Sequence, residues 1–250
     1  MRRRHRSLRG RMWSAMTVLI LMLAGVVGMG TPALADMNCY YGPRGHCYSN
    51  AIYNGSGLTG LWGYLPRNNT TINTGLSADA HISNEIWLNM DGDGYLEAGT
   101  VNWNDSHAYD GGCGCQAYDL VWADTTPGGR QAQQWQHVIQ HVTPNGAKDS
   151  FEFDHASGYD WNVYLNGSQV GHSTVTGGSS GNEMDMGGEY ASVSCQPAYG
   201  SADNFDDWAE VRDSGGNWFY PPIHTYIDSN CGFDGISYGD GEWSWNKHTP

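Results

Sequence analysis

EIWLNMDGDGYLEAGTVN, residues 85–102, is the stretch that decides the fold of this chain. Apolar and polar residues alternate on both sides of the central DGDG, which is the period of a β-strand with one buried face. Asp-Gly pairs supply the positive φ angles that tight hairpin turns need. The stretch therefore predicts two antiparallel strands, residues 80–90 and 95–103, joined by a turn at residues 91–94.

Further strand-like runs follow at roughly 10-residue spacing, which is typical of an all-β domain. They are YDLVWADT (118–125), WQHVIQHV (135–142), DSFEFDH (149–155), YDWNVYLN (159–166) and SQVGHSTV (168–175). Asn166-Gly167 is a two-residue hairpin turn signal between the last two runs. Only residues 129–141 are compatible with a helix, and there too the alternation favours a strand. The pattern predicts an antiparallel sandwich or barrel.

The beginning of the chain has the three parts of a secretory signal peptide. Six arginines lie within residues 1–12, an apolar run extends from Ala15 to Met29, and Ala33-Leu34-Ala35 forms an A-x-A cleavage site. We expect residues 1–35 to be removed, which leaves a secreted chain of 215 residues. No later apolar run is long enough to span a bilayer, so we expect no membrane association after cleavage.

The mature chain is expected to have an N-terminal arm with the first strands at residues 36–79 and a β-sandwich domain at residues 80–250. Without the signal peptide it has 6 basic and 26 acidic residues, a net charge of −20. Phosphate backbones would be repelled by this charge, which argues against nucleic acid as a partner. We expect a monomer.

All cysteines lie after the predicted cleavage site, and an even number in an exported chain favours three disulfides. They are Cys39, Cys47, Cys113, Cys115, Cys195 and Cys231. Cys39 with Cys47 is the expected local bridge, whereas Cys113 and Cys115 are each expected to bond a distant partner. Fifteen pairings are open for six cysteines. Zinc is an alternative use for them, but the chain has no CxxC pair.

Two glutamates stand out because small residues flank them inside strand-like runs. They are Glu97 in YLEAGTVN and Glu189 in MDMGGEYAS. Flanking Ala and Gly let a substrate backbone approach closely. If the two carboxyl groups lie close together, repulsion between them raises one pKa and leaves an ionised base beside a protonated acid. Such a pair could act on a water molecule.

These segments resemble two families of glutamic peptidases. EIWLNMDGDGYLEAGTVN resembles the tryptophan strand, turn and catalytic strand of the fungal eqolisins, with Glu97-Ala98-Gly99 where eqolisins have Gln-Thr-Gly. The neprosin family is a closer match, because its catalytic segments resemble EAGW and WGGE and this chain has EAGT and MGGE. The resemblance covers roughly residues 80–195.

The resemblance implies a β-sandwich of two large antiparallel sheets, a concanavalin-like jelly roll, with both glutamates on a concave face. Glu189 would be the general base that activates water, and protonated Glu97 would donate to the oxyanion. Trp87 would line the cleft. Thr100 and Met186 replace family aromatics and, with Gly188, are expected to shape substrate binding.

The expected function is that of a secreted glutamic endopeptidase that hydrolyses polypeptides at acidic pH without a cofactor or metal. Family analogy adds cleavage at proline as an expectation. The alternative is a non-catalytic secreted sandwich that binds glycan or protein, and two carboxylates would also suit glycoside hydrolysis. No zincin motif and no GxSxG are present in the sequence.

Calcium is a second alternative. Asn89, Asp91, Asp93 and Gly94 match the start of an acidic calcium loop, but its twelfth position is Thr100 in place of the bidentate glutamate. The hairpin turn explains the same residues. Residues 203–207 contain a further acidic segment, Asp203, Asp206 and Asp207, which is expected to form a turn.

Overall fold

The computed structural model describes residues 45–72, 80–104, 117–128, 133–192 and 200–248. Within these ranges the chain forms β-strands and one short 3₁₀ helix, η3 (Ser229–Cys231), and no α-helix. The predicted all-β class is confirmed. None of the described segments is a helix long and apolar enough to cross a membrane. The predicted signal peptide, residues 1–35, lies outside the described residues.

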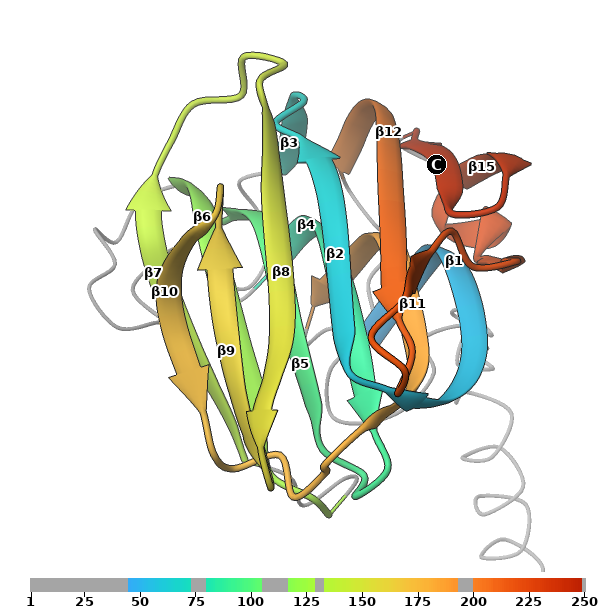
Figure 1. Ribbon diagram of the computed structural model, residues 1–250. Coiled ribbons are helices and arrows are strands. Elements are labelled where there is room, and N and C mark those ends of the chain that lie inside the picture. The colour runs from blue at the N-terminus through green and yellow to red at the C-terminus, as the bar shows by residue number, and fades with distance from the viewer. Residues whose placement is uncertain (1–44, 73–79, 105–116, 129–132, 193–199, 249–250) are drawn as a thin grey trace, which may run out of the picture. The chain divides into compact units, whose positions relative to one another are not determined.

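The described strands form two antiparallel sheets (Figure 1). The first sheet has seven strands in the order β14 (His224–Ile227), β1 (Gly45–Leu58), β11 (Gly181–Ser192), β4 (His81–Met90), β5 (Tyr95–Trp103), β6 (Ala117–Thr125) and β7 (Gln134–His141). The second has nine strands, with the path β10 (Ser168–Ser173), β9 (Asp160–Leu165), β8 (Lys148–Ser157), β2 (Gly60–Pro66), β12 (Gly200–Arg212), β16 (Glu242–Lys247) and β15 (Phe233–Gly239). The short strands β3 (Thr70–Ile72) and β13 (Trp218–Phe219) also pair with β12.

The expected antiparallel sandwich is therefore present, and its earliest strands belong to it. Residues 45–72, which the sequence separates as an arm with first strands, supply β1 to one sheet and β2 and β3 to the other. The described residues, from Gly45 to His248, belong to one compact unit by their contacts.

Both predicted hairpins are confirmed. β4 and β5 pair in register, with Trp87 opposite Glu97, and Asp93 in their turn has a φ of 66°. Asn166 and Gly167 join β9 to β10 with φ angles of 49° and 75°, the two positive values of a type I′ turn. Residues 134–141 form strand β7, as their alternation predicts.

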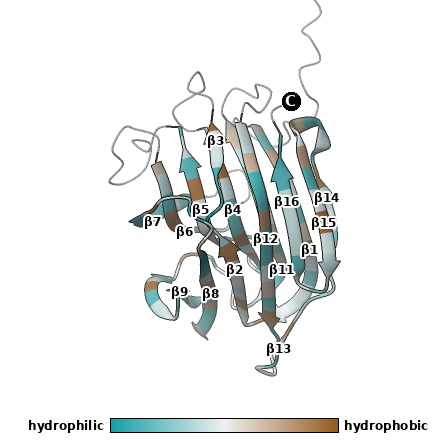
Figure 2. Ribbon diagram, turned by 90° about the horizontal axis from the view of Figure 1, so that it is seen from above, coloured by the Kyte–Doolittle hydropathy of each residue, from teal (hydrophilic) through white to brown (hydrophobic). Residues whose placement is uncertain are grey.

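The core lies between the sheets and is filled by every second residue of the central strands. On β4 these are Ile82, Ile86 and Leu88, all nearly inaccessible to solvent. The second sheet contributes large aromatic rings, and those of Phe205 and Trp245 stack with centroids 4.5 Å apart. Figure 2 shows hydrophobic and hydrophilic residues on the same strands in both sheets, as expected for strands with one apolar and one polar face.

A buried polar network crosses this core beneath β4. The amide of Asn84 donates to Asp207 at 2.9 Å, and the indole of Trp245 donates to both at 3.0 and 2.9 Å. Burial raises the pKa of Asp207 to about 7. The expected acidic turn at residues 203–207 is thus wrong: these residues lie within strand β12, where the period of two sends Asp207 into the core.

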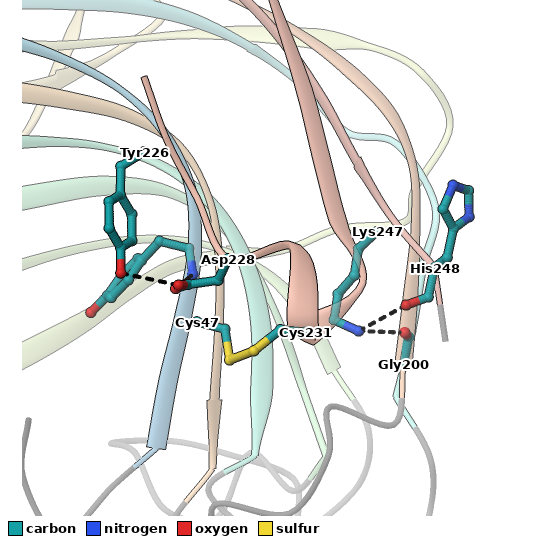
Figure 3. The surroundings of a disulfide bond; sticks show 8 residues. Cys47, Gly200, Tyr226, Asp228, Cys231, Lys247 and His248 are labelled. Atoms are coloured by element: carbon teal, nitrogen blue, oxygen red, sulfur yellow. Dashed lines mark hydrogen bonds between the residues drawn. A yellow bond between two sulfur atoms is a disulfide. The ribbon is translucent and has the colours of Figure 1, made fainter. Parts of the chain in front are cut away.

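One disulfide is present among the described residues, and it joins Cys47 of β1 to Cys231 of η3, 184 residues apart (Figure 3). The expected local bridge between Cys39 and Cys47 is therefore wrong. Cys47 is on the core face of β1, and the sheet brings β14 and the following η3 beside it, which a rule based on sequence separation cannot anticipate. Cys39, Cys113, Cys115 and Cys195 lie outside the described residues.

The disulfide fastens an edge strand that reaches the pocket described below. Asp228, just after β14, accepts bonds from the Tyr48 backbone N–H at 2.8 Å and the Tyr226 hydroxyl at 3.0 Å. Figure 3 shows the Tyr226 bond beside the disulfide and, on the other side, the buried Lys247 donating to the carbonyls of Gly200 and His248. The hydrogen bond to Asp228 and the nearby Cys47–Cys231 disulfide thus hold Tyr226 in place.

Candidate active site

A pocket of about 360 Å³ lies on the face of the seven-stranded sheet that points away from the core. Because strand side chains alternate, the lining consists of every second residue of the central strands. On β1 these run from His46 to Ile52 and on β4 from Glu85 to Asn89. The remaining lining residues are His81 of β4, Tyr95 and Glu97 of β5, Gln134 and Gln136 of β7, Asp185 and Glu189 of β11, and Tyr226 of β14.

The pocket contains both glutamates singled out in the sequence. β4 lies between β5 and β11, and Glu97 pairs with Trp87 of β4 whereas Glu189 pairs with Ser83. Ser83, Glu85 and Trp87 are two residues apart, so they point to the same face of the sheet. Their register partners on β5 and β11 point to that face as well. Glu97 and Glu189 therefore lie on opposite sides of β4, with Glu85 at the register position between them.

Glu97 is buried among neutral hydrogen-bond donors. Its carboxyl is in a residue only 6% exposed. The indole Nε1 of Trp87 donates to Oε2 at 3.1 Å and the amide of Gln134 donates to Oε1 at 2.6 Å. Burial, together with the charge of Glu189, outweighs these bonds and raises the pKa of Glu97 to about 8. This carboxyl is therefore protonated at neutral and acidic pH.

Glu189 is equally buried, at 7% exposure, but its neighbours are imidazoles. Nδ1 of His46 bonds its Oε1. Burial alone would raise the pKa of Glu189, but attraction to His46 and, further away, to His81 outweighs burial and holds that pKa below its usual range. The Tyr48 hydroxyl also stabilises the ionised carboxylate, and burial followed by the charge of Glu189 raises the pKa of Tyr48 well above its ordinary value.

The two carboxyl groups thus reach opposite protonation states in one pocket. Between the lowered pKa of Glu189 and the value of about 8 for Glu97, one is an ionised base and the other a proton donor. Pairs of titratable groups whose environments separate their pKa values are characteristic of acid–base sites. The arrangement could take a proton from water on one side and give one to a substrate oxygen on the other.

Trp87 lies in the pocket as expected, with its indole on Glu97. Thr100, Met186 and Gly188 do not line the pocket. Met186 belongs to the hydrophobic core, and a Cβ on Gly188 would lie 2.5 Å from the Trp245 ring. Each of the three is an odd number of residues from the glutamate on its strand, so the period of two turns it to the opposite face.

Several pocket residues were not anticipated from the sequence. Glu85 is two residues before Trp87, so alternation alone places it on the same face, and that signal was available. His46 and Tyr48 come from β1, and their approach to Glu189 depends on the pairing of β1 with β11, which spans more than 130 residues of chain. Gln134 begins β7, two strands away from Glu97, and had no sequence signal.

Within the described ranges, no group of three or more His, Cys, Asp or Glu side chains is arranged to hold a metal ion. In the turn considered for calcium, Asp91 accepts bonds from the Ser179 N–H at 3.0 Å and the Ser180 hydroxyl at 3.1 Å. The amide of Asn89 donates to Glu183 and Asp185, both at 2.9 Å. These side chains serve the hairpin and its neighbouring loop.

Comparison with known proteins gives a likeness of fold. No family model and no curated protein sequence matches the chain. It is similar to the crystal structure of scytalido-glutamic peptidase with a transition-state analog inhibitor, with a TM-score of 0.50 and 14% identity over 82% of this chain and 100% of that one. A complex of SCP-B, a member of the eqolisin family of peptidases, with the tripeptide Ala-Ile-His has a TM-score of 0.48 and 14% identity over 82% and 100%.

A galectin from Caenorhabditis elegans, LEC-6, has a TM-score of 0.32 and 14% identity over 61% of this chain and 98% of the galectin.

The match to scytalido-glutamic peptidase shows that the fold of the chain is similar to that of an eqolisin glutamic peptidase. The comparisons do not point to the neprosin family specifically.

Proposed function

We propose that this chain is a glutamic endopeptidase in which Glu189 is the general base and Glu97 the general acid. The observation that supports the proposal most directly is the pair itself: two buried glutamates in one pocket, one with a raised pKa and one with a lowered pKa. The eqolisin-like fold agrees with it.

In the first step Glu189 removes a proton from a water molecule, whose oxygen attacks the carbonyl carbon of the peptide bond. Glu97 gives its proton to the carbonyl oxygen, so that a neutral tetrahedral diol forms and Glu97 becomes the carboxylate. The bonds from Trp87 and Gln134 stabilise that charge as it develops.

In the second step Glu189, now protonated, gives its proton to the amide nitrogen as the carbon–nitrogen bond breaks. Glu97 recovers its proton from one hydroxyl as the new carboxyl forms. The products are a carboxylic acid and an amine, and both glutamates return to their starting states. His46 stabilises the ionised state of Glu189 at the beginning and end of the cycle.

Three finer statements belong to the same proposal. Export rests on the signal-peptide pattern of residues 1–35. A relationship to the neprosin branch, with cleavage at proline, rests on the EAGT and MGGE segments. Activity at acidic pH is supported by the lowered pKa of Glu189, which keeps the base ionised below its ordinary titration range.

The test is digestion of a denatured protein mixture between about pH 3 and 7, a range that lies below the pKa of about 8 at which Glu97 loses its proton. Wild type is compared with Glu189→Gln, Glu97→Gln and the control Glu210→Gln, which changes a glutamate of β12 in the other sheet. We expect Glu189→Gln to lower the rate by about 100-fold or more, the usual contribution of a general base.

Glu97→Gln is expected to keep more activity, because an amide can still donate a hydrogen bond to the oxyanion, and Glu210→Gln is expected to match wild type. Failure of folded wild type to cleave any component would refute the peptidase and leave a binding sandwich. Equal activity of wild type and Glu189→Gln would refute the assignment of the base.

A further inference from the structure

Glu85 is a third carboxyl group on the floor of the pocket, and the mechanism above does not use it. Its residue is 2% exposed, and it lines the pocket with Glu97 and Glu189. Its Oε1 is buried and makes no hydrogen bond within the described part of the chain. A buried polar atom without a partner is uncommon and destabilising, so its presence in a pocket needs an explanation.

The two strands beside β4 keep the space around Glu85 free of side chains. Its register partners are Gly99 on β5 and Gly187 on β11. A Cβ on Gly99 would lie 2.7 Å from Cγ of Glu85, so the Glu85 side chain lies over that glycine. Gly187 has a φ of 144°, which residues with a side chain rarely adopt. At the register position shared by Gly99, Glu85 and Gly187, the only side chain is therefore the carboxyl group of Glu85.

Burial, reinforced by nearby charge, decides the protonation state of the Glu85 carboxyl. Burial, and then the charges of Glu97 and Glu189, raise the pKa of Glu85 well above its usual range. Among the described residues, no lysine or arginine lines the pocket to compensate an ionised Glu85. An isolated buried charge would cost much more free energy than binding a proton. A protonated carboxyl has one O–H donor and needs an acceptor.

We propose that Glu85 is a neutral hydrogen-bond donor that contacts the substrate, giving its O–H to a backbone carbonyl of the bound peptide between Glu97 and Glu189. This inference rests on the proposed function, because it identifies peptide backbone as the ligand. The flanking glycines let that backbone approach the sheet at Glu85. Glu85 transfers no proton in this scheme.

Two substitutions test whether Glu85 donates a hydrogen bond to the substrate or makes no contact with it. Glu85→Gln keeps the shape and an N–H donor, and we expect kcat/KM to fall by about threefold. Glu85→Met keeps the size without a donor, and we expect a loss of about tenfold or more, the scale of one neutral hydrogen bond. Both variants should unfold at or above the wild-type temperature, since each removes a buried unpaired carboxyl. Equal activity of Glu85→Met and wild type would overturn the proposal, as would equal losses in both variants.

A spectroscopic test does not depend on turnover. The infrared spectrum of Glu97→Gln is compared with that of Glu97→Gln/Glu85→Gln at neutral pH. Protonated Asp185 and Asp207 contribute to both spectra, so the difference spectrum should contain the carbonyl band of protonated Glu85 alone. Absence of that band would overturn the neutral state. In Glu189→Gln, the Glu85 band is the one that Glu189→Gln/Glu85→Gln lacks. A peptide recovered from the wild-type digest should shift that band when it binds, and an unmoved band at saturation would overturn the contact.

The failure of the two proposals can be told apart. If folded wild type cleaves no peptide, the proposed function fails and the substrate contact of Glu85 fails with it. If wild type cleaves peptides and Glu189→Gln does not, but the Glu85 band is absent or unmoved, only the role of Glu85 is overturned.

Discussion

The two sides of the pocket hold the same residue type in opposite states. On the β5 side, Glu97 has an indole and an amide as partners and its pKa is raised to about 8. On the β11 side, Glu189 has the imidazoles of His46 and His81 nearby and its pKa is lowered. Burial raises the pKa of both glutamates, so the difference between them comes from the charge of their neighbours. Two glutamates of one sheet therefore become an acid and a base because different side chains lie beside them.

Among substitutions of the groups around the two glutamates, the largest effect on the pH dependence of activity is expected at His46, the partner of Glu189. In the proposed mechanism Glu189 acts only when ionised, and the positive imidazole of His46 holds the pKa of Glu189 down. In His46→Gln the pKa of Glu189 should rise, because burial is then less opposed, so the acidic limb of the kcat/KM profile moves to higher pH. Activity at the acid end of the profile should fall by roughly several-fold, with a smaller loss near pH 6.5.

His172→Gln, on β10 of the other sheet, is the matched control and should keep the wild-type profile. An acidic limb in the same place in His46→Gln and wild type would contradict the role given to His46.

The alkaline limb tests the other side of the pocket. Wild-type kcat/KM should fall as pH rises through about 8, because Glu97 then loses the proton it must donate. Glutamine does not titrate, so Glu97→Gln should have a lower plateau and no such limb. The ratio of variant to wild-type activity should rise by roughly tenfold for one pH unit above that pKa. An unchanged alkaline limb in Glu97→Gln would assign it to another group.

Folding stability should respond to the two glutamates with opposite signs. A raised folded pKa gives Glu97 a contribution that is complete below about pH 4.5 and is lost as pH rises through about 8. Glu97→Gln should therefore be more stable than wild type at neutral pH, by about 1–3 kcal/mol. Glu189 has a lowered folded pKa, so its contribution is present above its unfolded pKa and is lost as pH falls.

Glu189→Gln should accordingly be less stable than wild type at pH 7 and approach it in acid. Urea unfolding of the three proteins at pH 4.5 and pH 7 provides the comparison. Shifts of the same sign in both variants at pH 7 would show that burial, and not the neighbouring charge, dominates on both sides.

The smallest effect is expected from Gln134. Its amide donates to Glu97 at 2.6 Å and so favours the ionised form. Gln134→Leu should raise the pKa of Glu97 and move the alkaline limb upward by less than about one unit. Gln136→Leu is the matched variant, because Gln136 lines the same pocket from the same strand. Equal shifts in both variants would indicate a change in burial in place of a lost hydrogen bond.

Local pattern was sufficient to predict much of this molecule. The alternation and Asp-Gly turn of residues 85–102 predicted the hairpin that β4 and β5 form. The small neighbours of Glu97 and Glu189 identified two residues that the fold brings into one pocket. Both signals act over a few residues, where backbone geometry decides the outcome.

Features that depend on pairing between distant strands could not be predicted in this way. The approach of His46 to Glu189 and the bond between Cys47 and Cys231 both depend on where β1 lies in the sheet. Thr100, Met186 and Gly188 lie on the opposite face from the glutamates for a simpler reason: side chains alternate along a strand, so closeness in sequence does not put two residues on one face. That alternation would also have identified Glu85.

The position of the carboxyl groups within the sheet has a consequence for how the molecule loses activity. β4, β5 and β11 each have a hydrogen-bonded strand on both edges, so their amide protons should exchange with solvent only through the rarest openings. Fraying of an edge strand leaves Glu85, Glu97 and Glu189 in place. If the proposed function holds, heat inactivation and cooperative unfolding should therefore share one midpoint, because the three carboxyl groups leave the pocket only when the sheet unfolds.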